Sequence, residues 1–126
     1  MRRPLDPVLA AVLAWAVPGA GHLVLGRWQK GLLYFVSIVG TFVAGWLISG
    51  CGNVYFQSGR WHVLLQVGAG LVTFVIGFCS KAVEPKLTVM NFFEVGTLYT
   101  MVAGLLNVLV VMDASLTSIR LRRRRP

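Results

Sequence analysis

Apolar residues gather in four stretches that are separated by short segments carrying Gly, Pro or charge. The stretches cover residues 8–25, 31–50, 61–80 and 96–112. At about 1.5 Å per residue, a helix of roughly 20 residues matches the hydrocarbon core of a bilayer. The middle two stretches have this length and the last is near the lower limit. The pattern predicts an all-α membrane protein, a bundle of four transmembrane helices in a single domain over residues 1–126.

The first stretch is interrupted by Pro18, Gly19, Ala20 and Gly21. Pro removes a backbone donor and clashes with the preceding turn, so a helix is expected to break at Pro18-Gly19. In lipid, a carbonyl freed by such a break needs a partner from protein or water. The segment 8–25 is therefore either a kinked span or a re-entrant pair of half-helices.

Two segments flank the last predicted span. Residues 81–95 hold Pro85 and a mixed apolar and polar sequence, which predicts an interfacial segment anchored by Phe92 and Phe93. Residues 113–126 form a basic tail that is predicted to lie in the cytoplasm.

Composition supports lipid as the solvent. Hydrophobic residues make up 56% of the chain, only 13% are charged, and the mean hydropathy is +0.74. A soluble domain has about 25% charged residues and leaves much of its surface in water. These residues could not cover such a surface with polar groups.

The chain has twelve Lys and Arg against four Asp and Glu. Five of these cations end the chain: Arg120, Arg122, Arg123, Arg124 and Arg125. Because they follow an apolar stretch, they indicate anionic lipid headgroups as a partner rather than nucleic acid. With four spans, the side that holds both termini carries eight cations and the other side four. The excess predicts that both termini lie in the cytoplasm.

Small residues recur every fourth position along each stretch, which places them on one helix face. Such faces let helix backbones approach closely in lipid, and four of them predict one packed bundle. They are Ala10, Ala14 and Pro18; Ser37, Thr41, Gly45 and Ser49; Ala69, Thr73 and Gly77; and Gly96, Thr100 and Gly104. A weaker pattern is the recurrence of Gly26-Arg27-Trp28 as Gly59-Arg60-Trp61. It indicates either an inverted duplication or a chance repetition.

Polar residues inside a membrane are costly, so each is a candidate functional residue. His22 follows the break and could donate to carbonyls freed there, or titrate near the membrane face. Asn107 lies deep in the last stretch, where an interhelical hydrogen bond is its simplest role. Asp113 ends that stretch, against the helix dipole, and needs a partner such as Arg. Glu94 precedes it, where its charge suits a helix N-terminus.

No catalytic, phosphate-binding or metal-binding motif is present in the sequence. The two cysteines have neither a disulfide framework nor a metal spacing. We therefore expect a non-enzymatic structural or accessory subunit without cofactor or metal, which binds other membrane proteins or a second copy of itself. One alternative is a transporter or channel component that uses Asn107 and the break at Pro18–His22. Another is a membrane enzyme that uses His22 with Asp113.

Two stretches carry a resemblance to known families. The first is Trp15-Ala16-Val17-Pro18-Gly19-Ala20-Gly21-His22, followed by Leu25-Gly26-Arg27 and Lys30-Gly31. The second is Phe93-Glu94-Val95-Gly96-Thr97, followed by Ala103-Gly104-Leu105-Leu106-Asn107, Leu109 and Asp113-Ala114. Together they resemble an uncharacterised family of small bacterial multi-spanning inner-membrane proteins, a domain of unknown function. The first stretch is also similar to the two-transmembrane (TM-two) domain. The resemblance implies a bacterial inner-membrane location and no known ligand.

Overall fold

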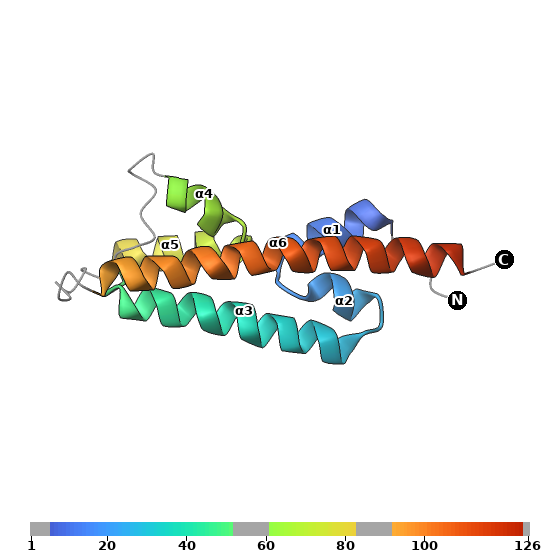
Figure 1. Ribbon diagram of the computed structural model, residues 1–126, viewed down its shortest axis with the longest axis horizontal. Coiled ribbons are helices and arrows are strands. Elements are labelled where there is room, and N and C mark those ends of the chain that lie inside the picture. Colours follow the sequence, from blue (N-terminus) through green and yellow to red (C-terminus); the bar gives the residue numbers. More distant parts are fainter. Residues whose placement is uncertain (1–5, 52–60, 83–91, 125–126) are drawn as a thin grey trace.

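The computed structural model describes residues 6–51, 61–82 and 92–124 of the chain. These residues form helices and no strand, so the all-α prediction is confirmed for this part of the chain. In chain order the helices are α1 (Pro7–Ala16), α2 (Ala20–Val24), α3 (Trp28–Ile48), α4 (Trp61–Val67), α5 (Leu71–Ala82) and α6 (Phe93–Arg123). They form an elongated bundle in which the beginning of α1 and the end of α6 lie at the same end (Figure 1).

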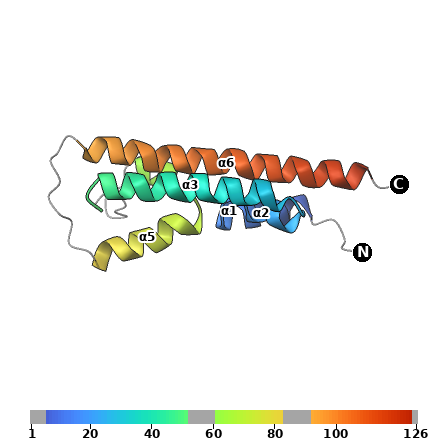
Figure 2. The ribbon, with the colours of Figure 1, turned by 90° about the horizontal axis from the view of Figure 1, so that it is seen from below.

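Two helices, α3 and α6, are long and apolar enough to cross a membrane. They have 21 and 31 residues, which correspond to about 32 and 46 Å. They lie antiparallel along the bundle, with Gly45 of α3 against Gly96 of α6 (Figures 1 and 2). A Cβ added to Gly45 would lie 2.7 Å from the carbonyl oxygen of Gly96, so this close approach of the two backbones depends on glycine.

Of the four predicted spans, only α3 and α6 are candidates for crossing a membrane, because the stretches 8–25 and 61–80 are broken helices. Residues 8–25 divide into α1 and α2 at Pro18-Gly19, where the break was predicted. Residues 61–80 also divide, into α4 and α5, at residues 68–70. Gly70 there has a φ of 71°, a left-handed conformation that ends the regular helix. At about 1.5 Å per residue, none of the four short helices reaches across roughly 30 Å of hydrocarbon.

The pair α1 and α2 enters and returns at one end of the bundle. α1 lies antiparallel to α6, because Asp6 contacts Arg122 while Trp15 contacts Asn107. α2 then folds back, and its Gly21 lies against Ala10 of α1. The two helices thus form a hairpin at one end of the bundle, and in a membrane this hairpin would correspond to the re-entrant reading of residues 8–25.

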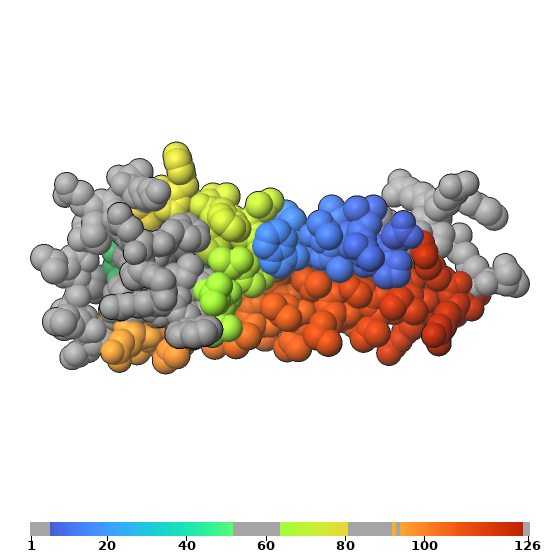
Figure 3. All heavy atoms as spheres, turned by 90° about the horizontal axis from the view of Figure 1, so that it is seen from above, coloured from blue at the N-terminus to red at the C-terminus, as the bar shows by residue number. Residues whose placement is uncertain are grey.

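The pair α4 and α5 does the same from the opposite end. α4 lies parallel to α6, because Gln66 contacts Thr100 and Gly68 contacts Asn107. α5 returns toward the end of α3, where Trp46 Nε1 donates to the hydroxyl of Ser80 at 2.7 Å. Seen from above, α1 and the α4–α5 pair meet near the middle of the bundle, alongside α6 (Figure 3).

The described helices therefore form two halves that share one order of elements and run in opposite directions. Each half has two short helices around a break and then one long helix: α1, α2 and α3, then α4, α5 and α6. This correspondence pairs α3 with α6. The sequence pattern Gly26-Arg27-Trp28 and Gly59-Arg60-Trp61 would instead pair the start of α3 with the start of α4, so it does not follow the structural halves.

α6 extends well beyond the predicted span 96–112. It begins at Phe93 and continues through most of the predicted tail to Arg123, because Leu116, Ile119 and Leu121 continue the apolar pattern and no Gly or Pro interrupts it. Of the predicted interfacial segment 81–95, residues 81–82 belong to α5 and 93–95 to α6, and its centre lies outside the described residues. Arg125 also lies outside them.

The faces of small residues form the helix interfaces, as the sequence predicted. Ala10, Ala14 and Pro18 are buried, as are Ala69, Thr73, Gly77, Gly96, Thr100 and Gly104. In α3 only Gly45 and Ser49 of the predicted set are buried, and Ile38 and Phe42 provide the rest of its contact surface. Large apolar side chains cover the outside of the bundle on every long helix.

Candidate functional site

Asn107 joins the two breaks. It lies near the middle of α6, is fully buried, and its Nδ2 donates to the carbonyl of Gly68 at 2.8 Å and to that of Trp15 at 3.2 Å. Trp15 lies in the last turn of α1, and Gly68 directly follows α4. One side chain thus binds the carboxyl-terminal ends of two half-helices that enter from opposite ends of the bundle.

These bonds answer the need that a broken helix creates. The last carbonyls of a helix have no partner within it, and in an apolar interior each unpaired carbonyl costs free energy. Sequence analysis predicted His22 as a donor to such carbonyls and Asn107 for an interhelical bond. In the structure Asn107 donates to these carbonyls, and His22 pairs with Asp113 instead. The Oδ1 atom of Asn107 is buried and has no hydrogen-bond partner among the described residues.

The second break was missed by sequence analysis. Gly70 packs so closely on the carbonyl of Trp15 that no Cβ could be accommodated, and Gly104 of α6 packs in the same way on Leu65. Both breaks contain the same tripeptide, Gly19-Ala20-Gly21 and Gly68-Ala69-Gly70. This repetition was the available signal, but the second copy lacks Pro and is surrounded by apolar residues, so hydropathy continues through it.

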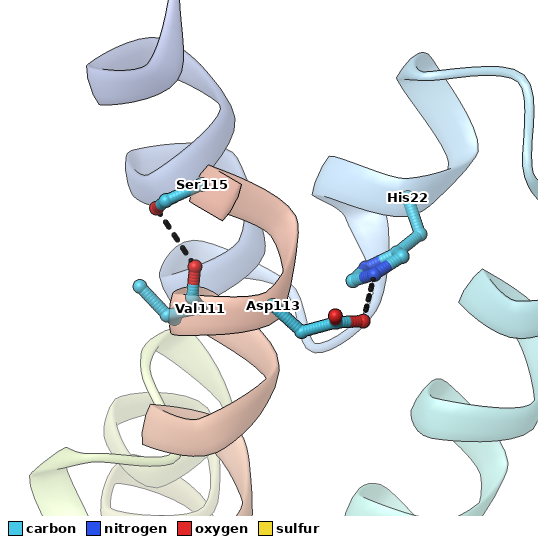
Figure 4. A network of polar contacts seen from close by, with 4 residues as sticks. All are labelled: His22, Val111, Asp113 and Ser115. Atoms are coloured by element: carbon cyan, nitrogen blue, oxygen red, sulfur yellow. Dashed lines mark hydrogen bonds and ion pairs between the residues drawn. The ribbon is translucent and has the colours of Figure 1, made fainter. Parts of the chain in front are cut away.

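His22 pairs with Asp113. The Nε2 atom of His22 in α2 lies 2.8 Å from Oδ2 of Asp113 in α6 (Figure 4). Sequence analysis expected a partner such as Arg for Asp113 and paired it with His22 only in the enzyme alternative; the partner is His22. The histidine is fully buried, while the side chain of Asp113 is 41% exposed. The carboxylate therefore separates the imidazole from the surface.

The imidazole is held on a second side by Tyr34 of α3. The two ring centroids are 5.1 Å apart at an interplanar angle of 69°, an edge-to-face contact. The Nδ1 atom of His22 is buried without a hydrogen-bond partner among the described residues. The hydroxyl of Ser115, also drawn in Figure 4, donates to the carbonyl of Val111 in its own helix. The pair thus ties α2 to α6 and α3.

A further layer of polar contacts lies between Asn107 and the opposite end of the bundle. Nε2 of Gln66 donates to the hydroxyl of Thr100 at 2.8 Å, and the hydroxyl of Thr73 donates to the carbonyl of Gln66. All three residues are buried. Sequence analysis treated Thr73 and Thr100 only as small residues and did not consider Gln66, because the span 61–80 was expected to be one regular helix.

The remaining candidates lie at the two ends. Glu94 is exposed in the first turn of α6, where its charge suits the helix dipole as predicted. Arg120, Arg122 and Arg123 lie in the last turn of α6, and Arg122 pairs with Asp6 at the beginning of α1. Within the described part of the chain, no group of three His, Cys, Asp or Glu could hold a metal ion.

Comparison with known proteins gives a family. A family model described as a family of unknown function (DUF6677) matches residues 9–126. No curated protein and no solved structure matches the chain.

Proposed function

We propose that this chain, which belongs to a family of unknown function (DUF6677), is a membrane protein with a structural or accessory role. In this proposal α3 and α6 are full spans, and the α1–α2 and α4–α5 pairs are re-entrant. The proposed location is a bacterial inner membrane, to which the resemblance to small multi-spanning membrane proteins also points.

Charge supports one orientation. Six of the described Lys and Arg residues lie at the end of the bundle where α3 begins and α6 ends, which we call the basic end: Arg27, Lys30, Arg120, Arg122, Arg123 and Arg124. One, Lys81, lies in the last turn of α5, at the opposite end of the bundle. Because cytoplasmic segments carry the excess of Lys and Arg, the basic end is proposed to face the cytoplasm with both termini. Arg27 and Lys30, which four spans would place outside, join the cytoplasmic side.

The observation that carries the structural role is the use of Asn107. Its amide nitrogen donates to the carbonyls of Trp15 and Gly68, so both hydrogen bonds of this buried side chain go to the protein's own backbone. A side chain used in this way stabilises the meeting point of the two broken helices. The function of the protein would then reside in its exposed helix faces and its basic end, which are available to other membrane proteins or to a second copy.

A transport component remains the alternative, and one observation favours it. In transporters with inverted repeats, broken helices meet near the middle of the membrane and their ends form the substrate or ion site. The two halves of this chain have that arrangement, and Oδ1 of Asn107 is buried without a partner among the described residues. In this case Asn107 and the carbonyls of Trp15 and Gly68 would bind a small cation.

An enzyme is not favoured, although His22 does lie within hydrogen-bond distance of Asp113. A general base must reach the proton that it removes from a substrate. Here the imidazole is fully buried and only the carboxylate is exposed, so a substrate at the surface would contact Asp113 and not His22.

Cysteine labelling tests the proposed topology. In a chain with Cys51→Ser and Cys79→Ser, single cysteines are introduced as Gln29→Cys and Gln57→Cys, and a membrane-impermeant maleimide is applied to intact cells. Two spans place residue 29 in the cytoplasm and residue 57 outside, so only the second variant is labelled. Four spans place them the other way round. Labelling of residue 29 in intact cells contradicts the proposal.

Reconstitution and crosslinking separate the accessory role from transport. For the accessory role, crosslinking should recover one consistent partner, and replacing Arg122–Arg125 by Gln should weaken that association or invert the topology. Liposomes containing the protein should pass monovalent cations no faster than protein-free liposomes. A cation flux that Asn107→Ala abolishes, in a variant that remains folded, would instead establish the transport function.

A further inference from the structure

A pocket lies at the basic end, between α6 and the turn that precedes α3. It has a volume of about 290 Å³ and is lined by Arg27, Thr117, Arg120, Leu121 and Arg124. Three of these residues come from α6 and Arg124 is the residue that caps its end, and spacings of three and four place all of them on one helix face. Arg27 comes from the turn between α2 and α3 and lies across the pocket from that face.

The position of Arg27 is fixed by the fold. Its backbone N–H donates to the carbonyl of His22 at 2.9 Å, and Gly26 before it has a φ of 80°, which allows the sharp turn. His22 is in turn bonded to Asp113, one helical turn before Thr117. The contact between α2 and α6 thus holds the Arg27 turn over the face that carries Arg120 and Arg124.

The pocket has no acidic lining residue to offset its three guanidinium groups. Asp113 is bonded to His22, and Asp6 is bonded to Arg122, which does not line the pocket. No salt bridge joins Arg27, Arg120 or Arg124 to an acid within the described residues. Arginines in the last turn of α6 suit its dipole, but Arg27 belongs to another element, and dipole compensation does not explain its place opposite them.

The surroundings of the pocket indicate a lipid. Leu121 lines it, and next to Arg27 the side chain of Trp28 is 62% exposed, at a level where an aromatic residue would meet the headgroups. A second pocket, lined by Gly26, Arg27, Trp28, Gln29 and Lys30, shares Arg27 with the first. Several guanidinium groups and a hydroxyl match the oxygens of a phosphate, because guanidinium binds phosphate through two parallel hydrogen bonds.

We propose that the pocket formed by Arg27, Thr117, Arg120 and Arg124 binds the phosphate of an anionic phospholipid headgroup. The inference rests on the proposed membrane location and gives the basic end a defined ligand in place of diffuse attraction to the surface. The bound lipid would link the α2–α3 turn to the end of α6 and so stabilise the re-entrant pair against the long helix.

Native mass spectrometry of the purified full chain in mild detergent tests the site, with phosphatidylglycerol as ligand and phosphatidylcholine as the zwitterionic control. The double variant Arg27→Gln/Arg120→Gln removes two charges from the pocket. The matched control, Arg122→Gln/Arg123→Gln, removes two charges from the same end outside it. We expect the pocket variant to bind phosphatidylglycerol about tenfold to a hundredfold more weakly. The control variant should lose less than about fivefold.

Two results would overturn the proposal. Equal losses in the pocket and control variants would show that the lipid responds to total charge. Binding of inorganic phosphate alone, with displacement of the lipid at equal concentration, would assign the pocket to a free anion. Circular dichroism and gel filtration check folding, and Arg124→Gln replaces the double variant if that fails to fold. Because binding is measured in detergent, it is independent of the cysteine labelling that tests topology.

Discussion

The side-chain amide of Asn107 donates to the carbonyl of Trp15, 92 positions earlier in the chain, and at the same time to the carbonyl of Gly68. Asn107→Leu should leave both carbonyls buried without this donor and lower the free energy of unfolding by about 1–3 kcal/mol. Thr41→Val is the matched control, because the Thr41 hydroxyl donates to the carbonyl of Ser37 in its own helix. Its effect should stay within about 0.5 kcal/mol. Reversible unfolding in detergent measures both, and equal stabilities for Asn107→Leu and the unmodified chain would contradict the bridging role.

Glycine at the second break is required for two separate reasons. Gly70 has a left-handed φ and packs against the carbonyl of Trp15, whereas Gly26 has a left-handed φ with open space around it. Gly26→Ala should therefore cost about 1–2 kcal/mol of stability from backbone strain alone. Gly70→Ala adds a clash and should cost more than about 3 kcal/mol. Thermal unfolding of the two variants measures the difference, and similar losses would mean that α1 and the second break are not in contact.

The crossing of α3 and α6 can be tested within one helix. Gly45 lies against the backbone of Gly96, while Gly40, five residues earlier in α3, has nothing within 4 Å of an added Cβ. Gly40→Ala should stabilise the helix by up to about 1 kcal/mol. Gly45→Ala should destabilise the bundle by about 1–3 kcal/mol, because the helices must separate. Denaturant titrations compare them, and a stabilising Gly45→Ala would place α3 and α6 further apart than described.

A double-mutant cycle measures the His22–Asp113 pair. With His22→Ala, Asp113→Ala and both together, we expect a coupling free energy of about 0.5–2 kcal/mol. The exposed pair of Arg122 and Asp6 serves as the reference, and its coupling should be below about 1 kcal/mol. Unfolding free energies of the six variants and the unmodified chain complete both cycles. A coupling free energy near zero for His22 and Asp113 would show that this contact does not hold α2 against α6.

Sequence patterns predicted the long helices and the first break because those features have local causes. An apolar run of sufficient length predicted α3, and Pro18-Gly19 predicted the end of α1, since Pro excludes a regular helix whatever its neighbours are. The run from 61 to 80 has no such residue. Gly and Ala are common in membrane helices, so Gly68-Ala69-Gly70 looks in the sequence like an ordinary close-packing motif. Only its contact with the backbone of Trp15 identifies it as a break.

Apart from the pairing of His22 with Asp113 in the enzyme alternative, the partners of the polar residues could not be predicted, because they come from distant parts of the chain. Asn107 and Asp113 were recognised as polar groups that are costly to bury in an apolar setting. This cost depends only on the residue itself and on its immediate sequence. Their partners, Trp15 with Gly68 for one and His22 for the other, depend on which helices adjoin. Sequence reasoning had placed His22 beside its own break, because that was the nearest group in need of a donor.

The bridge at Asn107 also has a consequence for the order of synthesis. A chain emerges from the ribosome with its N-terminal part first, so both pairs of short helices, α1–α2 and α4–α5, are synthesised before residue 107. Until then the carbonyls of Trp15 and Gly68 lack their side-chain donor, and neither pair of helices is stabilised by its hydrogen bond to α6. Maturation of this bundle would therefore be delayed until α6 is inserted, and nascent chains that stop before Asn107 should be preferred substrates of membrane quality-control proteases.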